Sequence, residues 1–170
     1  FTNYLRNGNS TGAIEHITNL QSKYKQTIKD LYTSEAYAEK ANTKITEIFN
    51  LLRTLASQPL TSDNENVIVA QGEMMSTNMV ALYMEEQGIN VKLLNSLEFM
   101  RLKANQEPDM EYLAENLAPM IESRTDGKIY IAQGFICMDS ESRISNLQRG
   151  GSDYTATLIG AALQVEEIQI

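Results

Sequence analysis

The chain has 170 residues, 42% of them apolar, and its 22 acidic and 14 basic residues give a net charge of −8. This composition is ordinary for a globular protein, while the acidic excess argues against a nucleic-acid partner, whose phosphates require clustered lysine and arginine. We also expect no membrane partner, because the sequence has neither an apolar run of about 20 residues nor a basic-then-apolar N-terminal signal. Cys137 and His16 are each the only residue of their kind, which excludes an internal disulfide and a Cys/His zinc site and suits a reducing cytoplasm.

The first third of the chain predicts helices. Apolar residues spaced by three and four positions run through residues 14–31 and again through 45–55, and Thr11 is placed to cap the first of these helices. The second pattern stops near Pro59, whose ring and missing N–H end helices. We therefore expect residues 1–60 to form a helical subdomain or lid.

Residues 61–170 predict an α/β portion, in which strands alternate with helices. A polar linker at 61–64 precedes a β-branched run at 67–70, which fits either a strand or the buried first turn of a helix. The elements expected after it are a helix over 73–87 ended by Gly88, a strand over 89–94, a helix starting at Pro108 and Asp109, and strands over 128–132 and 165–170. Such alternation predicts an α/β fold, a three-layer α/β/α sandwich with a mainly parallel sheet that is incomplete here. Ligands of such folds bind at the carboxyl ends of strands.

Residues 147–158 are the most informative stretch, because Arg149, two glycines, Ser152 and Asp153 directly precede an apolar helical pattern. Adjacent glycines let the backbone turn sharply, Ser152 or Asp153 suits the helix N-cap, and the N–H groups at a helix start attract anions. Arg149 adds a clamp for a carboxylate or a phosphate, whereas Asp153 needs a cationic partner such as an ammonium group, a lysine or Mg²⁺. By themselves these residues also suit a plain tight turn with an ordinary N-cap.

Three sequence blocks together resemble one enzyme family. Residues 149–156 read Arg-Gly-Gly-Ser-Asp-Tyr-Thr-Ala, residues 72–76 read Gly-Glu-Met-Met-Ser, and residues 133–135 read Gln-Gly-Phe; residues 97–101 add a weaker match. In order and spacing they resemble the aspartate kinases of the amino-acid kinase family. The resemblance covers roughly the whole chain and implies that residues 1–170 are the central part of one catalytic domain with the amino-acid kinase fold.

The resemblance also implies an activity. An aspartate kinase uses ATP to phosphorylate the β-carboxylate of L-aspartate, giving 4-phospho-L-aspartate, the first step toward lysine, threonine and methionine. ATP with Mg²⁺ is the implied co-substrate, and the complete protein is expected to be a cytoplasmic homo-oligomer.

Individual residues take roles from the same resemblance. Arg149 would hold the α-carboxylate of aspartate and Glu73 its α-ammonium group. Asp153 would be the catalytic residue, orienting the ammonium of an active-site lysine or of the substrate, because a carboxylate nucleophile already carries its charge and needs no general base. The remaining residues expected to bind substrate, as backbone donors or a pocket wall, are Gly134, Phe135, Gly150, Gly151 and Ser152. No metal ligand is expected among these residues.

Other interpretations of two of these residues stay open. Glu73 also suits the first turn of a helix, where the helix dipole favours a carboxylate, and Phe135 also suits an apolar core.

The sequence departs from the family in several places. The Lys-Phe-Gly-Gly-Thr-Ser opening, the Trp-Thr-Asp segment of the ATP pocket and the regulatory ACT domains are all absent, so the ATP segment is expected beyond Ile170 and these residues alone are expected to show no kinase turnover. Residues 102–103 are Leu-Lys where a Thr-Asp pair is common. Two alternatives remain: a protein of this fold with another acceptor, such as glutamate or a nucleotide, or a non-catalytic helical interaction or dimerisation module centred on residues 11–56.

Overall fold

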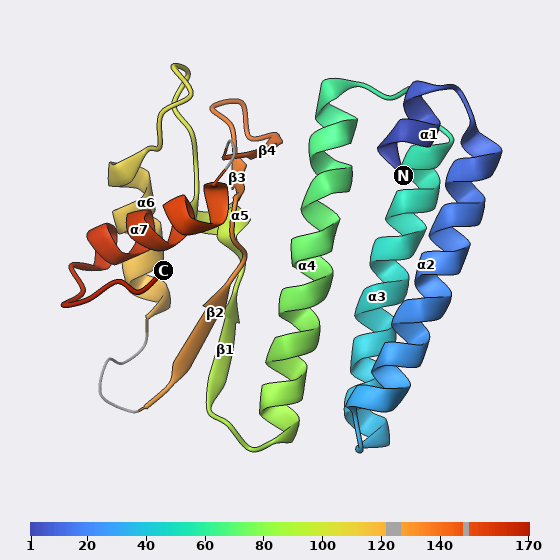
Figure 1. The fold of residues 1–170 in the computed structure, drawn as a ribbon. Helices are drawn as coiled ribbons and strands as arrows, with labels where there is room; N and C mark the ends of the chain where they lie inside the picture. The colour runs from blue at the N-terminus through green and yellow to red at the C-terminus, as the bar shows by residue number, and fades with distance from the viewer. Residues whose placement is uncertain (122–126, 148–149) are drawn as a thin grey trace. The chain divides into compact units, whose positions relative to one another are not determined.

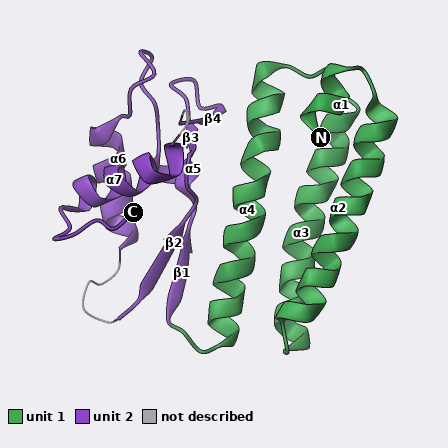
Figure 2. Ribbon diagram, viewed as in Figure 1, with its two compact units in different colours: residues 1–89 green, residues 90–170 purple. Residues whose placement is uncertain are grey.

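The structure is a computed structural model that describes residues 1–121, 127–147 and 150–170 (Figure 1). It divides into two compact units, Phe1–Ile89 and Asn90–Ile170 (Figure 2). The division falls between Ile89 and Asn90, whereas the sequence pattern placed it after residue 60. The reason is that the helix following residue 60 packs with the helices before it.

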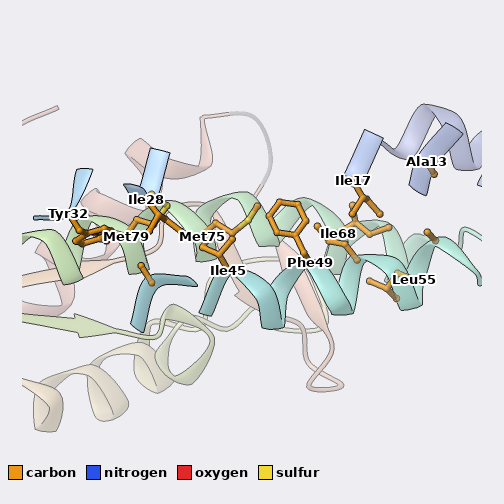
Figure 3. Close-up of a cluster of buried hydrophobic side chains, with 13 residues drawn as sticks. Ala13, Ile17, Ile28, Tyr32, Ile45, Phe49, Leu55, Ile68, Met75 and Met79 are labelled. Atoms are coloured by element: carbon orange, nitrogen blue, oxygen red, sulfur yellow. The ribbon is translucent and has the colours of Figure 1, made fainter. Parts of the chain in front are cut away.

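Helices alone form the first unit. They are α1 (Thr2–Arg6), α2 (Ser10–Leu31), α3 (Glu35–Ala56) and α4 (Ser62–Glu86). Helix α2 packs on α3, and α3 packs on α4, around a core that includes Ile17, Phe49 and Met75 (Figure 3). The helices predicted over 14–31 and 45–55 are confirmed. Asn9, rather than Thr11, caps α2, since its Oδ1 accepts a hydrogen bond from the Gly12 N–H at 2.8 Å.

Helix α4 differs most from the sequence prediction. The residues expected to be a polar linker start the helix, because the Thr61 hydroxyl accepts a hydrogen bond from the Asn64 N–H at 3.1 Å and carboxylates follow in the first turn. Residues 67–70 are therefore helical rather than a strand. Gly72 and Glu73 lie inside the helix, whereas the sequence predicted that the helix starts at Glu73. The predicted end of the helix is confirmed, with Gly88 at a φ of +72° just beyond it.

The second unit combines helices with short strands. Its elements are β1 (Val91–Leu94), α5 (Ser96–Phe99), α6 (Met110–Leu117), the 3-10 helix η1 (Ala118–Met120), β2 (Ile129–Ala132), β3 (Ile136–Met138), β4 (Ile144–Asn146) and α7 (Gly151–Leu163). Strands β1 and β2 are parallel, with Val91 opposite Ile129 and Leu94 opposite Ala132. This pair confirms the two strands predicted at 89–94 and 128–132. Asp109 caps α6 as its predicted start requires.

Two predictions about strands were incomplete or wrong. The antiparallel β3–β4 hairpin was not predicted, because its three-residue strands are too short to show alternation; the Asp139 carboxylate holds its turn by accepting hydrogen bonds from the Glu141 and Arg143 N–H groups. Residues 165–170 do not form the predicted strand. They are exposed and follow Gln164, whose left-handed backbone ends α7. Across the described residues, no helix combines the length and apolar character needed to cross a membrane.

Candidate functional site

The start of α7 is formed by a glycine turn. Gly150 has φ +80° and ψ 12°, a left-handed conformation that costs a glycine little, and it occupies the N-cap position. The predicted capping by Ser152 or Asp153 is wrong: both residues lie inside the first turn, two and three positions after the N-cap, and their side chains are exposed. The first N–H groups of α7 are consequently not capped by either of these side chains.

A hollow of about 460 Å³ lies at this turn. It is lined by Phe135, Asn146, Leu147, Gly150, Gly151, Ser152 and Asp153. Five of the residues predicted to bind substrate or to act in catalysis therefore share one hollow. Gly134 lines a neighbouring, more apolar cavity of about 740 Å³, which Ser152 also borders. The sequence prediction thus named residues from two separate loops that the tertiary structure brings together.

The two glycine-containing loops touch closely. A Cβ placed on Gly134 would lie 2.7 Å from the Ser152 Oγ and 2.9 Å from its Cβ, and a Cβ placed on Gly151 would lie 2.8 Å from the Phe135 Cβ. Distances this short are below van der Waals contact. Only glycine at both positions allows the start of α7 to approach the Gly134–Phe135 loop this closely.

Phe135 has an unusual backbone that hydrogen bonds hold from two sides. Its φ is +53°, in the left-handed region that a bulky residue rarely occupies. Its N–H donates to the Thr155 Oγ1 at 3.0 Å, and its carbonyl oxygen accepts from the Leu147 N–H at 2.7 Å. Phe135 is half-buried and borders the hollow, which favours its interpretation as a pocket wall.

Gln133 joins the ends of the two parallel strands just before this loop. Its Oε1 accepts a hydrogen bond from the Ser96 N–H at 2.8 Å, and its carbonyl oxygen accepts from the Ser96 Oγ at 2.7 Å. Both residues are buried, so the pair fixes where β2 ends and where the loop towards Phe135 begins. Neither Ser96 nor Thr155 was expected to matter. The only sequence signal was a serine two positions after a strand and a threonine four positions after the first residue of a helix.

Two predicted residues remain, Arg149 and Glu73. Arg149 lies outside the described residues. Glu73 lies in the first unit, half-buried in the interior of α4, where its carbonyl oxygen accepts from the Thr77 Oγ1 at 2.7 Å. The start of α4 is about three turns away, so the helix dipole does not account for a carboxylate at this position. Its contact with an ammonium group stays a prediction.

Cys137 lies on β3, two residues after Phe135, and is fully buried. Burial raises the pKa of this thiol to about 12, from an ordinary value of 9.0, and the nearby Asp139 carboxylate acts in the same direction. The thiol is therefore protonated at neutral pH and packs as an apolar group.

Comparisons with known proteins connect this geometry to one family. The family model described as "Amino acid kinase family" matches residues 7–170. The lysine-sensitive aspartokinase 3 of Escherichia coli is 34% identical over 119 residues, which cover 68% of this chain and 26% of the relative. The bifunctional aspartokinase/homoserine dehydrogenase 2 of the same organism is 30% identical over 145 residues, which cover 83% of this chain and 18% of that relative.

A solved structure agrees in fold as well. The crystal structure of E. coli aspartokinase III in complex with aspartate and ADP has a TM-score of 0.73 and 27% sequence identity, over 94% of this chain and 36% of that chain. The described chain thus spans about a quarter of the first relative's length and just over a third of the solved chain.

Proposed function

Because the chain belongs to the amino acid kinase family, we propose that the protein transfers the γ-phosphoryl group of ATP to the β-carboxylate of L-aspartate. One carboxylate oxygen forms a bond to the γ-phosphorus, the bond from that phosphorus to the bridging oxygen breaks, and the products are 4-phospho-L-aspartate and ADP. The similarity to aspartokinases in sequence and fold supports this choice of substrates, since one of them was solved with aspartate and ADP.

The hollow at the start of α7 is the observation that carries the proposal. The acceptor is a dicarboxylate and the donor is a polyanion, so the protein must supply positive potential where the two meet. The start of α7 offers backbone N–H groups and the positive end of the helix dipole, and Gly150 leaves room for a ligand to approach the backbone, because a Cβ placed there would meet no atom within 4 Å. An amino acid carboxylate matches these donors.

The proposal assigns three charged side chains to the bound aspartate and its surroundings. Arg149 binds the α-carboxylate through two parallel hydrogen bonds, and Glu73 binds the α-ammonium group. Asp153, which borders the hollow, orients an ammonium group beside the reacting carboxylate. Gly134, Phe135, Gly150, Gly151 and Ser152 complete the site as its wall and backbone donors.

Mg²⁺ enters this proposal only with ATP, as part of the second substrate. Within residues 1–121, 127–147 and 150–170, no three His, Cys, Asp or Glu side chains are grouped so that they could hold a metal ion. We therefore assign no Mg²⁺ ligand to the described side chains, and no step of the proposal runs through a metal ion held by them.

The decisive experiment measures acyl phosphate formation by the full-length protein. It is incubated with MgATP, L-aspartate and hydroxylamine, which converts an acyl phosphate into a hydroxamate that mass spectrometry identifies. We expect aspartyl hydroxamate together with an equal amount of ADP, and a preference of at least about tenfold over L-glutamate, whose extra methylene shifts the reacting carboxylate. Hydroxamate from glutamate but not from aspartate would contradict the proposed acceptor.

A further inference from the structure

Thr155 makes two hydrogen bonds that join separate parts of the site. It is 3% exposed and lies one turn into α7. Its hydroxyl donates to the Gly151 carbonyl oxygen at 2.7 Å and accepts from the Phe135 N–H at 3.0 Å. The first bond is common for a threonine in a helix, but the second reaches a different loop. Thr155 therefore ties the first turn of α7 to the wall of the hollow.

The Phe135 loop and the first turn of α7 are packed closely together. The Phe135 carbonyl is held at the same time by the Leu147 N–H at 2.7 Å. Gly134 and Gly151 contact Ser152 and Phe135 so closely that neither position has room for a Cβ. A shift of the Phe135 loop is thus passed directly to the first turn of α7, which carries Ser152 and Asp153.

We propose that Thr155 is a positioning residue, whose hydroxyl sets the distance between the Gly134–Phe135 wall and the first turn of α7 and thereby aligns the acceptor carboxylate. The inference rests on the proposed function, because the acceptor is the aspartate assigned above. Thr155 is not among the residues of the hollow at this turn, although it borders the neighbouring cavity of about 740 Å³. Its hydroxyl is engaged by the Phe135 N–H and the Gly151 carbonyl oxygen, so it acts through these two residues.

Two substitutions separate the hydroxyl from the rest of the side chain. Thr155→Val keeps the shape but leaves the Phe135 N–H without its acceptor, whereas Thr155→Ser keeps the hydroxyl. A matched control is Thr157→Val, which removes a hydroxyl that donates within α7, to the Tyr154 carbonyl oxygen at 2.7 Å. All three changes are made in the full-length protein.

We expect Thr155→Val to lower kcat/KM for aspartate about tenfold, the loss of one well-placed hydrogen bond, while the KM for ATP stays within about twofold. Thr155→Ser and Thr157→Val should stay within about threefold of the unmodified protein. Equal kinetics for Thr155→Val and Thr155→Ser would overturn the proposal. Parallel losses for both substrates would also overturn it, since they indicate a general structural defect.

Hydrogen exchange gives a readout that does not depend on activity. Mass spectrometry of the peptide containing Phe135 should show faster amide exchange in Thr155→Val than in Thr155→Ser. If the unmodified protein fails to phosphorylate aspartate but this difference is present, the proposed function is wrong, while the positioning of Phe135 by the Thr155 hydroxyl is supported. If exchange is equal in both variants, the positioning role of Thr155 is wrong whatever the activity.

Discussion

Gly134→Ala tests the close contact between the two loops of the site. The new Cβ would lie 2.7 Å from the Ser152 Oγ, 2.9 Å from its Cβ and 3.1 Å from its backbone Cα. The hydroxyl can rotate away, but the Cβ and Cα move only with the first turn of α7. The substitution therefore acts as a wedge between the Gly134–Phe135 loop and the helix start.

The size of the effect follows from these distances. Non-bonded carbon atoms rest at about 3.5 Å or more, so the two loops must separate by about 0.5 Å. Such overpacking costs about 1–3 kcal/mol of folding stability. A misplacement of about 1 Å near a reacting group can cost about a hundredfold in rate, so we expect roughly tenfold lower kcat/KM for aspartate from half that shift.

The assay combines steady-state kinetics with thermal unfolding of the full-length protein. Gly160→Ala is the control, because it places the same methyl group in α7 against the side chains of Ile168 and Val165, which belong to the exposed segment after the helix and can move. It should leave the aspartate kinetics within about twofold. The reasoning is refuted if Gly134→Ala retains full kcat/KM for aspartate and an unchanged melting temperature.

Four further outcomes are expected. Arg149→Ala should raise the KM for aspartate about tenfold or more. Arg149→Lys should not restore the KM, because a single ammonium cannot form the paired hydrogen bonds of a guanidinium. A normal KM in either variant would argue against binding of the α-carboxylate by Arg149. Asp153→Asn should lower kcat about a hundredfold, with an unchanged melting temperature because the side chain is exposed, and equal kcat values would remove its catalytic role. Burial raises the pKa of Cys137 to about 12, so the contribution of this thiol to the free energy of unfolding is complete below pH 9 and declines as pH rises toward 12. In Cys137→Ala, the free energy of unfolding should therefore depend less on pH in that window. The Arg101 guanidinium holds the pKa of Asp109 below its ordinary value of 3.8, so the contribution of this carboxylate to the free energy of unfolding is lost as pH falls below about 4. The free energy of unfolding, measured as pH is lowered, should show a smaller loss in Asp109→Asn.

The sequence predicted most of the long elements because their patterns are local. The helices at residues 14–31 and 45–55 and the strands at 89–94 and 128–132 are present. The main error lay at α4. There the polar residues after Pro59 suit a linker and a capped helix start equally well, and packing of α4 on α3 favours the helix.

The candidate site, like the fold, could be predicted from the sequence only in part. The glycine turn before α7 could be predicted, because Gly-Gly followed by an apolar helical pattern has few backbone solutions. Its capping could not, since Ser152 and Asp153 both suit an N-cap and only the left-handed Gly150 decides between the alternatives. Ser96 and Thr155 escaped prediction because their importance lies in hydrogen bonds to residues 37 and 20 positions away.

The sequence by itself therefore determined which residues are candidates for the chemistry and where most of the long helices and two of the strands lie, because residue type and local spacing can be read along the chain. Only the tertiary structure decided that Phe135 and Gly150–Asp153 share one hollow and that Thr155 binds Phe135. The physical reason is that the close contacts at the glycines, the buried hydrogen bonds and the left-handed backbone of Phe135 form only when segments distant in the sequence pack together. A turn that could have been plain helix capping thus becomes one wall of the candidate site, because it contacts the Gly134–Phe135 loop.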